Sequence, residues 1–154
     1  MKFIGIIGRN ISLKNVNNDE INAIQINEKN ITNVKNIKFQ IIIINEDLNN
    51  FDNMLEYLEK ILENTEYIII NSDIFIKMKI KPFDKKVITY GLNHKATVTI
   101  SSIKDESVLI DLQREIETLN SNLIEPGEKL IETPEAVNVY EILVNCIIEM
   151  ITEK

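Results

Sequence analysis

Two isoleucine-rich runs flank one amphipathic segment in this 154-residue sequence, and this arrangement restricts the fold more than any other feature. The runs are Phe39–Asn45 (FQIIIIN) and Tyr67–Asn71 (YIIIN), and each is typical of a strand that is covered on both faces. Between them, one helical face is predicted to carry Phe51, Met54, Leu55, Leu58, Ile61 and Leu62. A strand, helix, strand unit of this kind forms a crossover between parallel strands. The sequence therefore predicts an α/β protein with a parallel sheet.

Further apolar runs extend the predicted sheet. Lys2–Gly8 (KFIGIIG) is rich in isoleucine and ends in glycine, which is typical of a buried strand that enters a turn. Lys86–Tyr90 (KVITY), which also precedes a glycine, has the same character. Residues 10–36 contain nine asparagines, and their short apolar pieces at 23–26 and 31–34 predict brief strands or turns with no helix of any length.

Alternation of apolar and polar residues marks the part of the chain that follows. Residues 96–100 and 107–112 alternate on either side of a turn at 104–106, which predicts an antiparallel hairpin. Residues 116–124 and 129–131 indicate further short strands.

A helix is predicted to close the fold. Thr133 and Pro134 have the pattern of a helix cap and a first helical residue, and apolar residues then repeat at helical spacing over 137–151. We expect one domain over residues 1–154. Its fold class is α/β, a Rossmann-like, mostly parallel sheet with an antiparallel strand extension and few flanking helices.

Cysteine and histidine usage limits the chemistry available. Cys146 is the single cysteine, so no disulfide forms within the chain, and His94 is the single histidine, so these two residue types do not build a zinc site. We expect no metal site and no cofactor. The apolar runs are far shorter than a membrane span, and no signal-peptide pattern is present. A soluble protein of the reducing cytoplasm, without a membrane partner, is expected.

The charge is distributed unevenly. Residues 105–154 carry 3 Lys and Arg against 12 Asp and Glu, and this acidic surface argues against a nucleic-acid partner. Residues 77–104 contain seven lysines and one acidic residue. The lysines of this stretch either bind an anion or are simply solvated. The 31 isoleucines, 20 asparagines and 15 lysines indicate an A+T-rich genome, so a single Asn or Lys is weak evidence of function.

Four short signatures follow one another between residues 39 and 148. They are Ile43-Ile44-Asn45 with Asp47 after it, Asn71-Ser72-Asp73, Val87–Gly91 (VITYG) and Val137–Tyr140 (VNVY). In order and spacing they resemble the central, ATP-binding domain of the Mur ligase family, cytoplasmic amide ligases of cell-wall precursor synthesis. The alternative is an unrelated small α/β domain in which the composition produces the signatures.

The resemblance also identifies what this sequence lacks. The family's P-loop needs glycines followed by Lys-Ser or Lys-Thr, whereas the first strand here ends Gly8-Arg9-Asn10-Ile11-Ser12. No histidine follows Glu46 and Asp47, where the family has a magnesium-binding acid and a histidine, and Glu141 replaces the second Asn of the helix signature. We therefore expect a degenerate domain without the P-loop, and without the substrate-binding and C-terminal domains of the family.

Two classes of function remain. The first is a non-catalytic binding or interaction module for an unknown protein or small ligand, with candidate ligand-binding residues Arg9, Asn45, Asn71, Asp73 and Asn138 near the carboxyl ends of the strands. The structural alternative is that these residues only terminate strands and cap helices. The second class is a small enzyme acting on a cytoplasmic metabolite or cell-wall precursor, with Asp73 or His94 as acid or base. No catalytic constellation supports it, so we assign no catalytic residue.

Association is the last expectation from the sequence. Apolar residues over 119–124 and 147–151 lie near the end of the chain, where a homodimer would bury them. The alternative is that the final helix packs fully against the sheet and the chain is a monomer.

Overall fold

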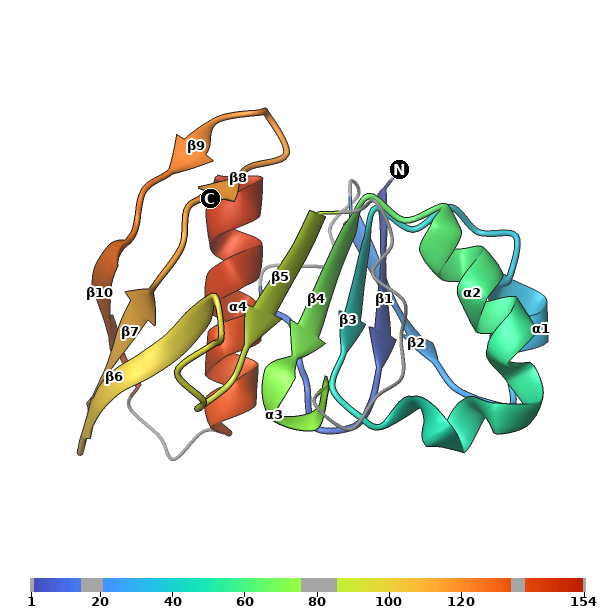
Figure 1. The fold of residues 1–154 in the computed structure, drawn as a ribbon, viewed down its shortest axis with the longest axis horizontal. Coiled ribbons are helices and arrows are strands. Elements are labelled where there is room, and N and C mark those ends of the chain that lie inside the picture. The colour runs from blue at the N-terminus through green and yellow to red at the C-terminus, as the bar shows by residue number, and fades with distance from the viewer. Residues whose placement is uncertain (1, 15–20, 76–85, 134–137, 154) are drawn as a thin grey trace.

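Eight strands form one sheet in the computed structural model, which describes residues 2–14, 21–75, 86–133 and 138–153. The strand order is β10-β7-β6-β5-β4-β3-β1-β2 (Figure 1). The parallel strands are β1 Lys2–Ile7, β2 Ile21–Ile26, β3 Ile41–Ile44, β4 Tyr67–Asn71 and β5 Lys86–Tyr90. The predicted strands at these positions and their parallel pairing are confirmed.

The sheet continues into an antiparallel extension. Strand β6, Val98–Lys104, pairs in parallel with β5 only through Val98 and Tyr90, and then pairs antiparallel with β7, Ser107–Leu112. Strand β10, Gly127–Glu132, pairs antiparallel with β7 and ends the sheet. The predicted hairpin is confirmed. Residues 116–124 form a separate two-stranded piece, β8 Ile116–Glu117 and β9 Leu123–Ile124.

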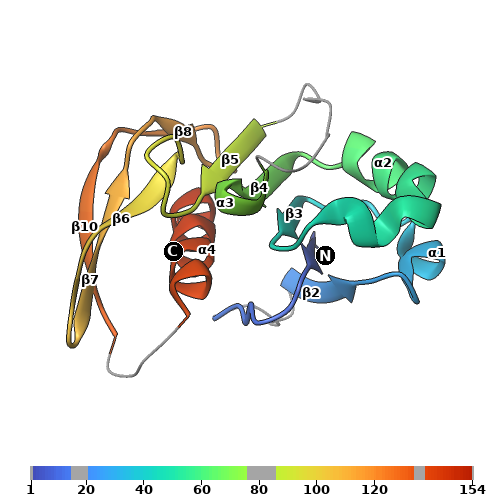
Figure 2. The ribbon, with the colours of Figure 1, turned by 60° about the horizontal axis from the view of Figure 1, so that its bottom comes forward.

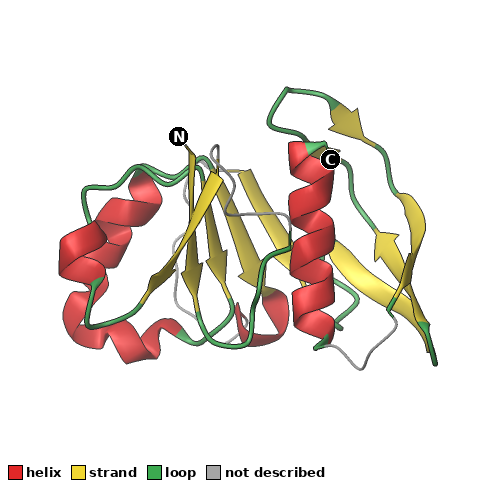
Figure 3. Ribbon diagram, turned by 180° about the vertical axis from the view of Figure 1, so that it is seen from behind, coloured by secondary structure: helices red, strands yellow, loops and turns green. Residues whose placement is uncertain are grey.

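Both faces of the parallel sheet are covered, which explains the uninterrupted apolar runs. Along β3, Ile41 and Ile43 belong to the apolar cluster that includes helix α4, Val139–Thr152. Ile42 and Ile44 belong to the opposite cluster, which includes α1, Ile31–Val34, and α2, Leu55–Glu63. Figures 2 and 3 show α4 between the parallel strands and the antiparallel extension, and α1 and α2 at the other end of the molecule. The fold class expected from the sequence is confirmed.

Three helices differ from the expectation. Residues 31–34, expected to form a brief strand or a turn, form the single helical turn α1, and side-chain hydrogen bonds of Asn27 and Asn30 close a turn immediately before it. The helix expected over 51–62 is confirmed from Leu55 onward as α2, whereas the residues before it form a 3₁₀ segment, Leu48–Met54, which kinks at Phe51. A further turn, α3 Ser72–Phe75, follows β4.

The final helix starts later than expected. The N-cap of α4 is Asn138, whose side chain accepts a hydrogen bond from the Tyr140 N–H, so the prediction of a cap at Thr133 is wrong. The expected first helical residue, Pro134, lies outside the described residues.

The apolar side of α4 is buried within the chain. Ile147, Ile148 and Ile151 are at most 4% exposed, whereas Leu123 in β9 is 62% exposed. Of the apolar surface expected to pair in a homodimer, the helical part is therefore already covered, and the dimer stays a prediction. Among the described residues, no helix combines the length and the apolar composition needed to cross a bilayer.

Candidate functional site

Polar side chains gather where β3, β4 and β5 end. Asn71, at the end of β4, donates its side-chain amide to Asn45 Oδ1 at 3.0 Å. The Tyr90 hydroxyl, at the end of β5, donates to the same oxygen at 2.7 Å. Because parallel strands end at one edge of the sheet, three successive strand ends are joined by these hydrogen bonds.

Asp73 ties this edge to the turn after β5. Its carboxylate accepts hydrogen bonds from the Leu92 N–H at 2.9 Å, the Asn93 N–H at 3.2 Å and the Asn93 side-chain amide at 2.8 Å. A Cβ atom at Gly91 would come within 2.8 Å of Asp73 Oδ1, so glycine is required for this approach. Asp73 therefore caps the turn that leads from β5 toward β6.

The same carboxylate also reaches the final helix. The Tyr140 hydroxyl, in the first turn of α4, donates to Asp73 Oδ2 at 2.9 Å, and its ring meets the Tyr90 ring edge-on at 6.2 Å between centroids. Burial acts to raise the pKa of Asp73, but the hydrogen bonds from Leu92, Asn93 and Tyr140 hold that pKa below its usual value. Burial, together with the bond to Asp73, raises the pKa of the Tyr140 hydroxyl. Asp73 is therefore an ionised acceptor, and Tyr140 is a neutral donor.

The segment after β1 is held by α4. Glu141 Oε1 accepts a hydrogen bond from the Ser12 N–H at 2.6 Å. Asn145 Oδ1 accepts from the Lys14 N–H at 2.7 Å, and the amide group of Asn145 donates to the Ser12 carbonyl at 2.9 Å. Asn138 donates to the Asn10 carbonyl at 3.4 Å. Three side chains at the start of α4 thus satisfy backbone groups over residues 10–14.

A cavity of about 610 Å³ lies beyond the carboxyl ends of β1, β2 and β3. Gly8 has a φ of +118°, and a Cβ there would lie 2.9 Å from the Asn45 carbonyl carbon, so glycine brings the β1 loop against β3. Burial raises the pKa of Glu46, and the positive charge of Arg9 acts in the opposite direction. The polar and charged lining comes from Arg9, Asn10, Gln25, Asn27, Glu28, Lys29 and Glu46.

Similarity to solved structures is found over almost the whole chain. The structure of MurF from Acinetobacter baumannii matches with a TM-score of 0.57 and 13% sequence identity. This chain has a Mur-ligase-like fold. The match covers 99% of this chain and 43% of MurF, so the chain spans less than half the length of that protein. The sequence matches no protein-family model and no curated protein at a significant level.

The Mur-ligase-like fold brings some of the sequence-predicted site residues together and separates others. Asn45, Asn71 and Asp73 form one connected group, Arg9 borders the cavity beside it, and Asn138 caps α4. His94 is exposed in a turn, and no hydrogen bond joins its side chain to this group among the described residues. Sequence reasoning missed Tyr90 and Tyr140, although Tyr90 precedes the strand-ending glycine and Tyr140 follows the helix-start asparagine by two positions. No described residues group three His, Cys, Asp or Glu side chains closely enough to hold a metal ion.

Cys146 is expected to be inert toward thiol reagents in the folded protein. Its side chain is buried at 2% exposure, and burial raises the pKa of the thiol to about 11. Relative to the ordinary value of 9.0, this lowers the reactive thiolate fraction at neutral pH by about a hundredfold. Alkylation by iodoacetamide, followed by mass spectrometry with and without urea, measures this. Equal labelling rates in both conditions would show that the thiol is accessible.

Proposed function

We propose that this chain is a non-catalytic binding module of the cytoplasm, a single domain over residues 1–154 that takes a small polar ligand at the carboxyl ends of β1, β2 and β3. The observation that carries the proposal is the cavity of about 610 Å³ at this edge. Its lining includes two positively charged residues, Arg9 and Lys29, and two negatively charged residues, Glu28 and Glu46. Open parallel sheets bind ligands beyond the carboxyl ends of their strands, and this cavity has that position.

The neighbouring polar residues support a binding role without catalysis. Asp73 has four hydrogen-bond donors from Leu92, Asn93 and Tyr140, which leave it poorly suited to take a proton from a substrate. Glu141, which replaces the second Asn of the Mur helix signature, is engaged by the Ser12 N–H. Both carboxylates are thus occupied by groups of the fold itself, and Glu141 is so at the position where the resemblance implies contact with adenine.

The enzyme hypothesis has no comparable support. A general acid or base needs a partner and a substrate position within hydrogen-bond reach. Asp73 is held by structural donors, and His94 is exposed in the turn before β6. The Ser72 hydroxyl beside Asp73 is itself engaged by the Tyr90 carbonyl and the Asn93 side-chain amide, so we retain the binding module.

A thermal-shift panel tests the proposal. Wild type, Arg9→Ala and Arg114→Ala are screened against inorganic phosphate, nucleotides, amino acids and sugar phosphates. A ligand of the native state raises the midpoint of unfolding, and we expect at least one compound to do so for wild type and Arg114→Ala but not for Arg9→Ala. Arg114 is the matched control because it is the only other arginine and bonds to Thr97, away from the cavity. A shift that survives Arg9→Ala would place the binding site elsewhere and contradict the proposal.

A further inference from the structure

Strand β10 leaves one side of its backbone open. The Thr133 N–H bonds to the Glu106 carbonyl, and the register then directs the backbone groups of residues 127, 129 and 131 toward β7. The N–H and C=O groups of Glu128, Leu130 and Glu132 therefore point away from β7. Among the described strands, none pairs with this side, since β10 ends the sheet. The edge offers three residues of unpaired ladder to an extended chain.

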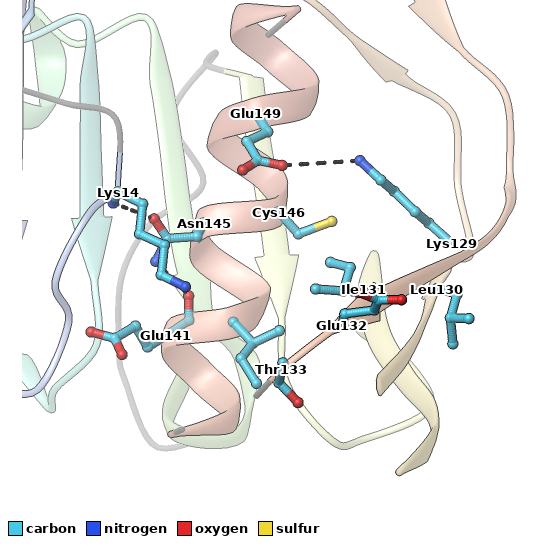
Figure 4. A pocket seen from close by; sticks show the side chains of 11 residues that line it. Lys14, Lys129, Leu130, Ile131, Glu132, Thr133, Glu141, Asn145, Cys146 and Glu149 are labelled. Atoms are coloured by element: carbon cyan, nitrogen blue, oxygen red, sulfur yellow. Dashed lines mark hydrogen bonds and ion pairs between the residues drawn. The ribbon is translucent and has the colours of Figure 1, made fainter. Parts of the chain in front are cut away.

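A cavity of about 340 Å³ lies beside this open edge, between β10 and α4. Ile131 from β10 and Ile142 and Cys146 from α4 give it an apolar interior. The Cys146 sulfur points from α4 toward β10, and Lys129 reaches across to Glu149 at 4.0 Å (Figure 4). A strand added to β10 would place every second side chain on the α4 face, over this cavity.

Acidic side chains dominate the other face of β10. Glu128 and Glu132 flank Leu130, which is 63% exposed, and the three residues share a face because they are spaced by two. The final third of the chain is acidic as a whole, with 12 acidic and 3 basic residues. Residues opposite Glu128 and Glu132 in an added strand are favoured when they are basic, because opposite charges across a ladder stabilise the pair.

We propose that the edge of β10 is a docking site for an extended basic peptide segment of a partner protein, which adds a strand to the sheet. Its backbone pairs with Glu128, Leu130 and Glu132, its apolar residues enter the cavity beside Ile131 and Cys146, and its basic residues lie beside the two glutamates. Strand addition supplies affinity through main-chain hydrogen bonds and specificity through alternate side chains. This surface is separate from the cavity at Arg9, and the two proposals stand or fall independently.

Backbone methylation of a probe peptide tests strand addition directly. The probe is a labelled, capped peptide with the order lysine, valine, threonine, valine, lysine, and its binding is followed by fluorescence anisotropy. The added strand is antiparallel to β10, with the threonine opposite Leu130 and the lysines opposite the two glutamates. We therefore expect N-methylation of the threonine and both lysines to abolish binding, because in an antiparallel pair the N–H groups of these residues point toward the β10 backbone. N-methylation of both valines, whose N–H groups point away from β10, leaves the affinity unchanged. Equal effects of the two patterns, or no binding of the unmodified probe, would overturn the proposal.

Variants of β10 give the complementary test on the protein. Leu130→Pro removes an N–H that β7 does not use, so we expect the sheet to be retained while probe binding is lost. The control Leu130→Ala should retain both the sheet and probe binding. The double variant Glu128→Lys, Glu132→Lys should lower the affinity for the basic probe by about tenfold, since two exposed ion pairs become repulsive. Circular dichroism verifies that each variant is folded. Undiminished binding to folded Leu130→Pro would contradict a peptide site. So would light scattering that shows a dimer for wild type and a monomer for Leu130→Pro, because a second copy of the chain would then occupy the edge.

Discussion

Replacing Leu58 with alanine is expected to lower the free energy of unfolding by about 2–5 kcal/mol, because it removes a buried side chain and leaves a cavity. Leu58 is 2% exposed in α2 and packs in the cluster that covers Ile42 and Ile44 of the central strand β3. The structure around a truncated core side chain relaxes only partially, so part of the cavity is expected to remain. Urea unfolding followed by circular dichroism measures the change.

Leu55→Ala is the matched control on the same helix. Leu55 is 43% exposed, so its truncation should change stability by no more than about 0.5 kcal/mol. The pair of variants separates the loss of burial from any effect of alanine on the helix itself. A loss below about 1 kcal/mol for Leu58→Ala, or equal losses for both variants, would show that α2 packs through a different face.

The variant Asp73→Asn is expected to lose about 2–3 kcal/mol of stability at neutral pH, since hydrogen bonds to a charged acceptor are lost and an amide donor faces other donors. The carboxylate joins α3 to the Leu92 and Asn93 N–H groups and to the Tyr140 hydroxyl. One substitution therefore weakens the attachment of both the turn after β5 and the start of α4. Urea unfolding at pH 7 measures the loss, and Asp111→Asn in β7 serves as the control. A loss no larger than that of the control would contradict the bridging role.

The pH dependence of that loss gives a second readout. The folded-state pKa of Asp73 lies below its ordinary value of 3.8, so the ionised group stabilises the fold above that value. The stabilisation is lost as the pH falls through the lowered pKa, because the folded protein must then also take up the proton. The difference in stability between wild type and Asp73→Asn should be constant above about pH 5 and shrink below pH 4. A difference that grows toward acidic pH would mean that Asp73 is protonated in the folded state.

The central sheet was predictable because both of its faces are buried, which leaves a continuous apolar run in the sequence of each central strand. Ile41 and Ile43 face one apolar cluster and Ile42 and Ile44 the other, so the run has no polar interruption. The hairpin β6–β7 was predictable for the opposite reason. Val108, Ile110 and Leu112 are buried, while the residues between them are half-exposed. In both cases, the pattern reports which faces of the strand are covered.

Helix starts were harder to predict because several residues competed for the capping position. Asn138 and Thr133 are both good N-caps by residue type, but the Thr133 N–H continues the pairing of β10 with β7 by bonding to the Glu106 carbonyl, whereas the Asn138 side chain caps α4. For residues 31–34 the sequence left a brief strand and a turn open, and the hydrogen bonds between Asn27 and Asn30 close a turn just before the single helical turn α1. In each case, hydrogen bonds decided between alternatives that local propensity left open.

The candidate site was predictable only in its position along the strands. Parallel topology brings Asn45 and Asn71 to one edge, and the structure joins them at 3.0 Å. The other hydrogen bonds around the site join residues that are far apart in the sequence. Tyr140 is 67 residues from Asp73, and Glu141 is 129 residues from Ser12. No local sequence pattern predicts contacts at such separations, so the hydrogen bonds between α4 and the segment after β1 were found only in the structure.

Calorimetric titration with Mg-ATP tests most directly the claim that this Mur-ligase-like fold works without ATP chemistry. The β1 loop, Gly8-Arg9-Asn10-Ile11-Ser12, has no Lys-Ser or Lys-Thr pair for the phosphates and magnesium, and its Ser12 N–H is bonded to Glu141. We predict no saturable heat at micromolar ATP, and no phosphate release above a protein-free control after prolonged incubation. A micromolar dissociation constant for Mg-ATP would contradict the account, and turnover of the nucleotide would contradict it outright.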